Sequence, residues 1–572
     1  MSIQLQATKK QDPPDEETPR IGVFICHCGA NIAGFVNVEE AAKYASSLPD
    51  VAFVQKNLYT CSETGLREIK TAIKEHKLNR VLVASCTPRT HEPLFKSTCQ
   101  EAGLNRYLFE LVNIREQCSW VHMQDPVRAT EKAKQLIRMG VARVALLEPR
   151  QEITVEVTRK ALVIGGGVAG ISAALSIAAS NIPVILVERE KELGGLLRDV
   201  NKLYPTLGAA SELVDEHVKK LQKAPLIKVM TRAKVLNVSG FIGNYKVQID
   251  SAGEQIEDTV GVIVVATGAR IMIPNGMYGY DGKNVVMQTE LERRLKDGSF
   301  SARSVVMIQC VGARVPEREY CSRICCMTAI KNAILIRETY PETEIFVVYR
   351  DIQTFGTLYE EDYRRARELG VGFLRYGLAK LPAVDEGGVT VYDELLGKNV
   401  RIPYELLVLS APLVAPEGVT ELSKMLKVPL DANGFYLEAH AKLRPVEFAT
   451  DGVYLCGCAR WPCDIGDAVY QGRGSAARAL IPLRKGKVYA EPLYAEVNPN
   501  VCRDCRRCVE SCPYSAITTV EETVHGYQRT VSKVNPVLCK GCGACSVLCP
   551  TGAIGMKHYD NTLIMAMIGK AF

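Results

Sequence analysis

Eight cysteines near the end of the chain restrict its possible folds more than any other feature. They form two copies of the spacing C-x2-C-x2-C-x3-C-P, and flanking residues repeat with them, since Val497-Asn498-Pro499 recurs as Val534-Asn535-Pro536. The cysteines are Cys502, Cys505, Cys508 and Cys512 in the first copy and Cys539, Cys542, Cys545 and Cys549 in the second. The repeat predicts a small domain, residues 485–572, folded around two cysteine loops.

This spacing is that of bacterial ferredoxins with two [4Fe–4S] clusters. Three thiolates of one loop can bind three corners of a cubane, and the fourth, directed onward by its proline, reaches the other cluster. We therefore predict one cluster held by Cys502, Cys505, Cys508 and Cys549, and a second held by Cys539, Cys542, Cys545 and Cys512. A zinc site or a degenerate ferredoxin is the alternative, and the presence of all eight ligands counts against both.

The other cysteines are grouped as well. Of 21 in the chain, six precede residue 120, four lie within 310–326 and three within 456–463. In a chain of 572 residues without an apolar leader, such groups predict metal sites and a cytoplasmic location rather than disulfides. We expect the three within 456–463 to be thiols lining a pocket, and residues 1–20 to be a flexible tail.

Composition excludes some classes of function. The chain is 47% hydrophobic and 23% charged, as in ordinary globular proteins. Its net charge of +6 is spread without long basic runs, which argues against nucleic-acid binding. No apolar run approaches the roughly 20 residues that a membrane helix needs. The run Leu563–Ile568 is far shorter, and we expect it to pack on this chain or on a partner.

The middle of the chain carries a dinucleotide-binding pattern. A predicted strand over 160–164 leads into Gly165-Gly166-Gly167-Val168-Ala169-Gly170, an Ala-rich helix over 171–180 and a second strand over 184–187 that ends at Glu188. In this context Gly165 makes the turn, Gly167 admits the pyrophosphate and Gly170 lets helix and strand pack closely. Glu188 is expected to accept hydrogen bonds from the ribose.

Three later segments favour FAD over a nicotinamide cofactor, because they are similar to segments of flavoproteins with two dinucleotide-binding domains. These segments are Gly194-Gly195, Ala266-Thr267-Gly268 after a strand over 262–265, and the late strand within 450–457, which ends at Gly457. Val235 is expected to contact the adenine. Where related flavoproteins have Gly-Asp this chain has Gly457-Cys458, so Asp467 or Asp464 is expected to replace the missing aspartate. A nicotinamide-only domain is the alternative.

A second, inserted Rossmann unit has lost its phosphate loop. A strand over 304–308, a helix over 323–338 and a strand over 344–349 form its frame, but no glycine-rich loop joins the first strand to the helix. Four cysteines stand there instead: Cys310, Cys321, Cys325 and Cys326. We predict that this unit does not bind NAD(P)H and that the four thiolates bind a third [4Fe–4S] cluster. A redox disulfide and simple buried thiols are the alternatives.

This set of cysteines, within a flavin domain and followed by a two-cluster ferredoxin domain, resembles the HdrA family of heterodisulfide reductase components. The resemblance implies a [4Fe–4S] cluster beside the FAD. It also implies that Lys331 approaches the flavin N5, where its charge favours the anionic reduced flavin. Many members carry a further ferredoxin unit, which is missing here because 225–260 contains no cysteine.

Three N-terminal cysteines, Cys26, Cys28 and Cys86, follow predicted strands over 21–25 and 81–85, whose ends gather at one edge of an α/β sheet. The resemblance implies a cluster in this domain, and we predict the ligands Cys28, Cys61, Cys86 and Cys118, with Cys26 as the first substitute. The expected fold is therefore α/β: an N-terminal Fe–S domain (21–150), a thioredoxin-reductase-like FAD domain (158–484) with an inserted degenerate nicotinamide unit (283–400), and a ferredoxin domain (485–572).

The resemblance implies an oxidoreductase component that performs flavin-based electron bifurcation. Implied partners are other subunits of such a complex (HdrB- and HdrC-like, hydrogenase or formate dehydrogenase subunits), ferredoxin, and a second copy of the chain. No acid, base or thiolate pair for a disulfide substrate is evident from the sequence. Two rivals are a self-contained NAD(P)H:ferredoxin oxidoreductase, disfavoured by the missing glycine loop, and an electron relay without bifurcation.

Overall fold

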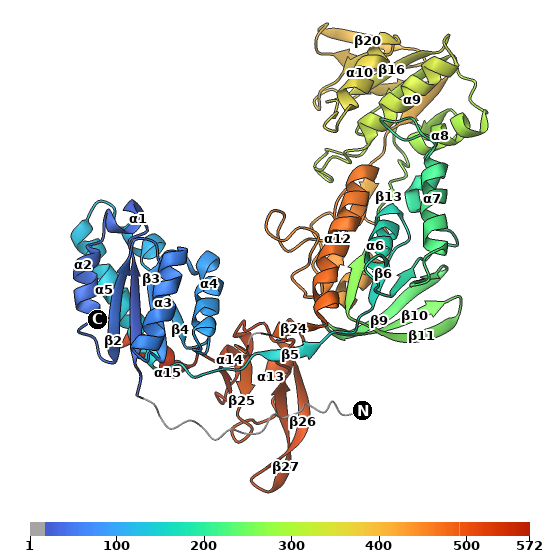
Figure 1. Ribbon diagram of the computed structural model, residues 1–572. Helices are drawn as coiled ribbons and strands as arrows, with labels where there is room; N and C mark the ends of the chain where they lie inside the picture. Colours follow the sequence, from blue (N-terminus) through green and yellow to red (C-terminus); the bar gives the residue numbers. More distant parts are fainter. Residues whose placement is uncertain (1–17, 491, 572) are drawn as a thin grey trace. The chain divides into compact units, whose positions relative to one another are not determined.

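The computed structural model describes residues 18–490 and 492–571. The expected tail over 1–20 therefore lies almost wholly outside the described residues. The described chain forms two compact units, one made of residues up to Ile153 together with those from Tyr489, the other running from Thr154 to Val488 (Figure 1). Strands β5 (Ile153–Glu156) and β24 (Lys487–Ala490) lie where the chain passes between the units.

The first unit begins with a parallel four-stranded sheet of order β2-β1-β3-β4. Its strands are β1 (Ile21–Cys26), β2 (Val51–Asn57), β3 (Arg80–Ser85) and β4 (Phe109–Asn113). Its helices are α1 (Ala30–Ala33), α2 (Val38–Ala45), α3 (Glu63–Glu75), α4 (Pro88–Glu101), the π-helical turn η1 (Arg115–Ser119) and α5 (Pro126–Ala145). The helices cover both faces of the sheet (Figure 1).

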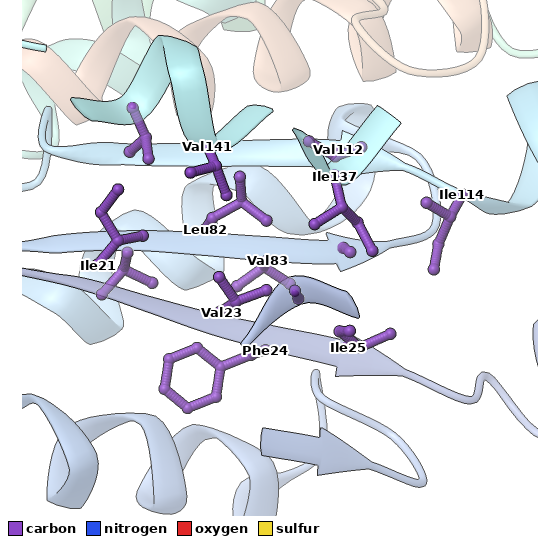
Figure 2. Packing of buried hydrophobic residues seen from close by; sticks show 14 of the residues in the cluster. Ile21, Val23, Phe24, Ile25, Leu82, Val83, Val112, Ile114, Ile137 and Val141 are labelled. Carbon is purple, nitrogen blue, oxygen red and sulfur yellow. The ribbon is translucent and has the colours of Figure 1, made fainter. Parts of the chain in front are cut away.

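The core of this sheet explains why the strands were predictable. All six residues of β1 are buried, as expected for a central parallel strand covered on both faces. Figure 2 shows Ile137 and Val141 of α5 packing against the sheet beside Leu82 and Val112. Because parallel strands end at the same edge, the cysteine-bearing loops after β1 and β3 meet there.

The C-terminal part of the same unit is small and built around the cysteine repeat. It contains β25 (Ala495–Val497), α13 (Arg507–Glu510), the hairpin β26 (Ile517–Val524) and β27 (Tyr527–Val534), α14 (Ala544–Leu548), β28 (Ile554–Met556) and α15 (Asn561–Ile568). Helix α15 packs against α5, and its Leu563 is buried in the core of the N-terminal sheet. The apolar run near the C-terminus thus packs on this chain.

The second unit contains two parallel five-stranded sheets. The first has the order β23-β12-β6-β7-β8 and the second the order β14-β21-β15-β16-β17. The strands of the first are β6 (Ala161–Ile164), β7 (Val184–Val187), β8 (Ile227–Met230), β12 (Val262–Val265) and β23 (Val453–Leu455). It carries α6 (Val168–Ala178), η2 (Gly195–Asp199), α7 (Ala210–Gln222), α11 (Val419–Leu426), η3 (Gly457–Ala459) and α12 (Ile465–Lys485).

The second sheet is the inserted unit, and two short strands, β13 (Arg270–Ile271) and β22 (Leu413–Val414), pair where the chain enters and leaves it. Its strands are β14 (Val285–Met287), β15 (Ser304–Ile308), β16 (Glu344–Tyr349), β17 (Gly372–Arg375) and β21 (Leu406–Leu409). Its helices are α8 (Gln288–Asp297), α9 (Cys325–Thr339) and α10 (Tyr359–Glu368). Since β21 lies inside this sheet, the insertion runs past the expected end at residue 400.

Two antiparallel meanders complete the second unit. One consists of β9 (Ala233–Phe241), β10 (Asn244–Ser251) and β11 (Glu254–Val260), which fill the segment where an inserted ferredoxin was judged missing. The other consists of β18 (Ala383–Asp385), β19 (Gly388–Asp393) and β20 (Lys398–Ile402). Within the described residues no helix is long and apolar enough to cross a membrane.

Candidate flavin and iron–sulfur sites

The glycine loop between β6 and α6 has the geometry that a dinucleotide phosphate requires. Gly165 has a φ of +112°, and a Cβ on it would lie 2.2 Å from the carbonyl oxygen of Ala266. A Cβ on Gly170 would lie 1.9 Å from the carbonyl oxygen of Gly165, so this glycine lets the helix pack on the loop. Gly167 is the N-cap of α6 and faces open space, where an anion can reach the helix N-terminus.

Glu188 directly follows β7, and hydrogen bonds to both of its carboxylate oxygens hold its buried side chain in place. Its Oε2 accepts from the Gly166 amide at 2.6 Å and its Oε1 accepts from the Glu190 amide at 2.8 Å. The carboxylate therefore stands beside the glycine loop in one orientation, as a group that binds a ribose must.

A cavity of about 650 Å³ extends from this loop toward the inserted unit. Eight of the twelve predicted flavin contacts line it: Gly165, Gly167, Glu188, Gly194, Gly195, Ala266, Thr267 and Gly268. The buried Thr267 hydroxyl has no hydrogen-bond partner among the described residues, so it is available to a ligand. The open cradle at Gly167 and this unpaired hydroxyl both fit a bound FAD, which the residues above would hold.

Four predicted flavin contacts do not line the cavity. Gly170 and Gly457 are packing glycines, since a Cβ on Gly457 would lie 2.7 Å from the Ala169 side chain. Val235 is buried in the core between the first sheet and β9. The fourth, Asp467, forms an ion pair with Arg323 at 3.2 Å and lies outside the lining.

The alternative aspartate lies at the cavity instead. Asp464 lines it and caps α12, with Oδ1 accepting from the Asp467 amide at 2.8 Å. Its Oδ2 accepts from the Tyr359 hydroxyl at 2.8 Å. Of the two aspartates considered for the closing turn, the structure therefore places Asp464 at the cavity.

Lys331 projects from α9 to the cavity wall and is 1% exposed. Its Nζ donates to Glu292 Oε1 at 2.5 Å and to the carbonyl oxygen of Lys202 at 2.9 Å. Burial lowers the pKa of Lys331, and the Glu292 carboxylate opposes that shift. Glu292 was not foreseen from the sequence, because nothing local marks a glutamate of α8 as the partner of a lysine on another helix.

The four cysteines of the inserted unit share one region. The pKa values of the Cys325 and Cys326 thiols are raised first by burial and then by the nearby Cys310 and Cys321. Cys325 and Cys326 open α9, whereas Cys310 lies two residues after the end of β15 with a φ of +60°. The structure thus brings the four together where a phosphate loop would lie.

The turn after β15 packs on the segment where the chain enters the insertion. A Cβ on Gly312 would lie 2.5 Å from the side chain of Met272, which directly follows β13. The Tyr320 hydroxyl donates to the carbonyl oxygen of Leu413 in β22 at 2.7 Å. The segment between β15 and α9 is thus held close to β13 and β22.

Cysteines from the two copies of the repeat lie close together. A small cavity is lined by Cys512, Cys539, Cys542 and Cys545, which come from both copies. Cys502 and Cys549 pack in one apolar cluster beside Val531, and Cys549 and Cys508 also belong to the neighbouring cluster that contains Cys512, Cys539 and Cys545. The predicted exchange of the fourth cysteine requires that Cys512 lie near the second loop and Cys549 near Cys502, as they do here.

The N-terminal cysteines are gathered differently from the prediction. The pKa of Cys61 is raised first by burial and then by the nearby Cys26 and Cys28 thiols. Cys86 in turn lies near Arg115 and near the thiols of Cys26, Cys28 and Cys61. Arg115 donates from Nη1 to the Cys28 sulfur at 3.6 Å.

Cys118 lies apart from this group. It is wholly buried in the core of the first sheet, and its thiol donates to the carbonyl oxygen of Ala129 at 3.1 Å. Cys118 is thus the one predicted ligand that lies apart from the others, whereas Cys26, the predicted substitute, lies among them. Cys118 belongs to η1, which turns its side chain toward the core.

Among residues 18–490 and 492–571, no three histidine, cysteine, aspartate or glutamate side chains converge closely enough to hold a single metal ion. This finding concerns mononuclear sites, because a cubane has an iron at each liganded corner and spreads its thiolates more widely than one ion does.

The fold and the sites define an oxidoreductase in which a flavin domain is joined to an iron–sulfur dicluster domain. Residues 159–308 match the pyridine nucleotide-disulphide oxidoreductase family, and residues 501–553 match the 4Fe-4S dicluster domain. A solved thioredoxin reductase from T. acidophilum is 18% identical, covering 56% of this chain and 98% of its own, at a TM-score of 0.41. That superposition is too loose to carry an argument.

Relatives that match most of the chain identify the family within this class of oxidoreductases. The chain is 39% identical to an HdrA-type iron–sulfur component of the CoB–CoM heterodisulfide reductase of Methanopyrus kandleri, over 89% of this chain and 92% of the relative. It is also 39% identical to the HdrA-type component of the H(2):CoB-CoM heterodisulfide,ferredoxin reductase of Methanothermobacter thermautotrophicus, over 90% and 93%. The chain belongs to the HdrA family of heterodisulfide reductase components, as the cysteine pattern predicted.

Proposed function

We propose that this electron-transfer protein divides electron pairs at its FAD between two one-electron routes, as the bifurcating or confurcating component of a heterodisulfide-reductase-like complex. Flavin exchanges electrons in pairs or singly, whereas each [4Fe–4S] cluster exchanges one. One relative is named as a reductase of both a heterodisulfide and ferredoxin, and two acceptors in one name are what a divided electron pair requires.

One observation carries the proposal. The first turn of α9 borders both the flavin cavity and the cysteine set, since Ile324 and Thr328 line the cavity while Cys325 and Cys326 lie between them in the sequence. Thiolates thus lie at the start of α9, where a nicotinamide-binding domain would bind a phosphate. Electrons leaving the flavin on this side then pass singly to a cluster.

The proposed cluster ligands are those that the structure gathers: the eight ferredoxin cysteines, the set from Cys310 to Cys326, and Cys26, Cys28, Cys61 and Cys86. The corresponding measurement is iron and acid-labile sulfide per FAD in the chain purified without oxygen. We expect about 16 irons, because four cubanes hold four each. A value near 8 would leave the ferredoxin pair alone and remove the two other sites.

Bifurcation itself is tested by the two one-electron potentials of the flavin. We expect them to be strongly crossed, with the second electron easier to add than the first, so that the one-electron-reduced flavin does not accumulate in an anaerobic titration. Accumulation of that form would assign the protein to simple relay instead. Prompt bleaching of the flavin by NADH or NADPH, without any partner, would favour the self-contained oxidoreductase.

Partners are proposed on the same basis. The relatives are named as single components of larger reductases, so we propose that this chain works with HdrB- and HdrC-like subunits and with an electron-donating subunit. The exposed cysteines Cys505 and Cys542 place the ferredoxin loops at the surface, where a partner can reach them.

A further inference from the structure

Two cysteines at the flavin cavity belong to none of the proposed clusters. Cys458 and Cys463 both line the cavity, and their sulfur atoms are 3.6 Å apart. Cys463 is 5% exposed, and the Cys458 thiol also lies 3.4 Å from the carbonyl oxygen of Cys463. The two side chains therefore face each other across one turn of chain, an arrangement that their spacing in the sequence did not reveal.

The local backbone explains this pairing. Cys458 lies in the short helical turn η3, and Cys463 directly precedes Asp464, the N-cap of α12. The N-terminus of a helix stabilises a nearby thiolate, because its free amides carry partial positive charge. A hydrogen bond from Cys463 and the nearby Arg323 lower the pKa of Cys458, while burial opposes them.

The neighbouring Cys456 provides a contrast within the same segment. It is fully buried in the core behind the first sheet and does not line the cavity. Burial raises the pKa of its thiol to about 12, which is the behaviour of an inert core cysteine. Proximity in sequence therefore does not by itself produce the paired arrangement.

We propose that Cys458 and Cys463 form a reversible disulfide, a two-electron redox site that faces the flavin cavity. A disulfide bond is about 2.05 Å long, so the sulfurs need to approach by about 1.5 Å, which small rotations about the Cα–Cβ bonds supply. On closure the two S–H bonds break and one S–S bond forms, releasing two protons and two electrons. An oxidised flavin bound in the cavity would accept the two electrons and two protons and become reduced flavin, and the reverse step would return them to the sulfurs.

This site differs in kind from the clusters, because it stores electrons only as a pair. It also does not depend on the proposed bifurcation, since the disulfide forms between two residues of this chain whatever the flavin does afterwards. The proposal can therefore fail while the proposed function stands, and the reverse also holds.

Peptide mapping tests the bond directly. The intact protein is equilibrated without oxygen in dithiothreitol or in excess glutathione disulfide and then denatured in excess N-ethylmaleimide, so that buried free thiols are capped as they become exposed. It is digested with trypsin, which cuts after Arg460 but not before Pro445. Cys458 then lies in the peptide 443–460 and Cys463 in the peptide 461–473. We expect the linked pair of peptides, two hydrogen masses below the sum, to increase at least about tenfold in the oxidising buffer.

Two matched variants test whether the disulfide forms through Cys458 and Cys463 or through the nearby Cys456. Cys456→Ser should keep the linked pair, and Cys463→Ser should abolish it. A second measurement counts electrons: oxidised wild-type protein should accept two more electrons per FAD than Cys463→Ser during reductive titration. Absence of the linked pair in wild-type protein in every buffer, a link through Cys456, or equal electron uptake by the two proteins would each overturn the proposal.

Discussion

At the scale of single residues, the Lys331–Glu292 pair offers two opposite charge changes at one place in the flavin cavity. Both side chains are almost fully buried, so neither charge is screened by water. Lys331→Met removes a positive charge and should lower the flavin potential by on the order of 30 mV, equivalent to about 1.4 kcal/mol for two electrons. Glu292→Gln removes a negative charge and should raise it. Spectroelectrochemical titration measures both.

The sign of the two shifts is the decisive result. Shifts in the same direction would mean that the variants act by loosening the cavity rather than by charge, and would contradict the proposed place of Lys331 beside the flavin. Lys331→Met should also destabilise the unit by about 3–5 kcal/mol, because it leaves the buried Glu292 carboxylate without its partner. Denaturant unfolding of the apoprotein separates this loss from the redox effect.

Two glycines of the phosphate loop should respond differently to alanine. In Gly167→Ala the new methyl group enters open space in the chain, so the apoprotein should keep its Tm while FAD binding is lost. In Gly170→Ala the methyl group meets the Gly165 carbonyl oxygen at 1.9 Å, so both the fold and FAD binding should suffer. Gly474→Ala, in open space on α12, is the control. Retained FAD in Gly167→Ala would show that the pyrophosphate lies elsewhere.

The sequence predicted those glycines because their role is local, set by the strand before them and the helix after them. It could not predict Glu292, whose partner lies on another helix, nor that Cys118 lies apart from the other N-terminal cysteines. Cys118 belongs to η1, and only the packing of η1 on the core turns its thiol inward. The sequence pattern does not predict the contacts that side chains make between different helices and strands of the site.

At the scale of elements, Arg143 of α5 anchors the C-terminal segment to the N-terminal sheet. It pairs with the partly buried Glu110, donates from Nη2 to the carbonyl oxygen of His558 at 3.1 Å, and lies 4.7 Å from the ring centroid of Tyr559. Arg143→Ala should cost about 2 kcal/mol, because the partly buried Glu110 loses its ion-pair partner and the carbonyl oxygen of His558 loses its donor. Hydrogen exchange should show faster exchange in α15.

Arg128→Ala is the matched control, since Arg128 lies on the same helix but is mostly exposed. Its effect should remain below about 0.5 kcal/mol. Equal exchange rates for α15 in the two variants would show that α15 is held by Leu563 and its apolar neighbours instead.

The same junction should loosen in acid. His558 is buried and contacts the carbonyl oxygen of Glu148 through Nε2 at 2.9 Å. Burial lowers its pKa from 6.5, and Arg150 and Arg143 lower it further while the Glu148 carbonyl opposes. Above pH 6.5 the imidazole is neutral in both states. Below it the unfolded chain binds the proton first, so stability falls by up to about 1.4 kcal/mol per pH unit until the folded pKa is reached.

Comparison of His558→Gln with wild-type protein isolates this contribution. The difference in Tm between pH 7.5 and 5.5 should be smaller in the variant, because glutamine can still donate to Glu148 but does not titrate. His525→Gln, at an exposed hairpin turn, should behave as wild type. A variant with the full wild-type acid sensitivity would contradict the role of His558.

Elements were predicted where their boundaries are local. The strands over 304–308 and 344–349 were placed at their observed ends, because apolar runs are bounded there by polar residues. The expected limit of the inserted unit at residue 400 was too early, since β21 joins that sheet by pairing with β14 and β15. Whether a strand joins a sheet depends on pairing with strands far along the chain, and the hydrophobic periodicity of a segment does not predict that pairing.

At the scale of the whole molecule, the cysteine inventory predicts how iron is distributed. Sixteen cysteines are proposed as ligands, with Cys26 rather than Cys118 in the N-terminal set because Cys118 lies in the core of the first sheet. Each proposed cluster has its own set of four ligands, so the loss of one set should remove one cluster and leave the others bound. Iron per FAD therefore reports each set independently of any catalytic assay.

The N-terminal set gives the sharpest case. Cys26→Ala should lower the iron content by about four per FAD, because the cubane of that domain loses a ligand. Cys118→Ala should keep all of the iron and cost about 1 kcal/mol or more of stability, since it removes a buried sulfur from the core. The pairing of the two variants is informative because both lie in one domain and delete the same atoms. Iron loss in Cys118→Ala with none in Cys26→Ala would restore the ligand set expected from the sequence and would require η1 to turn outward when the cluster is bound.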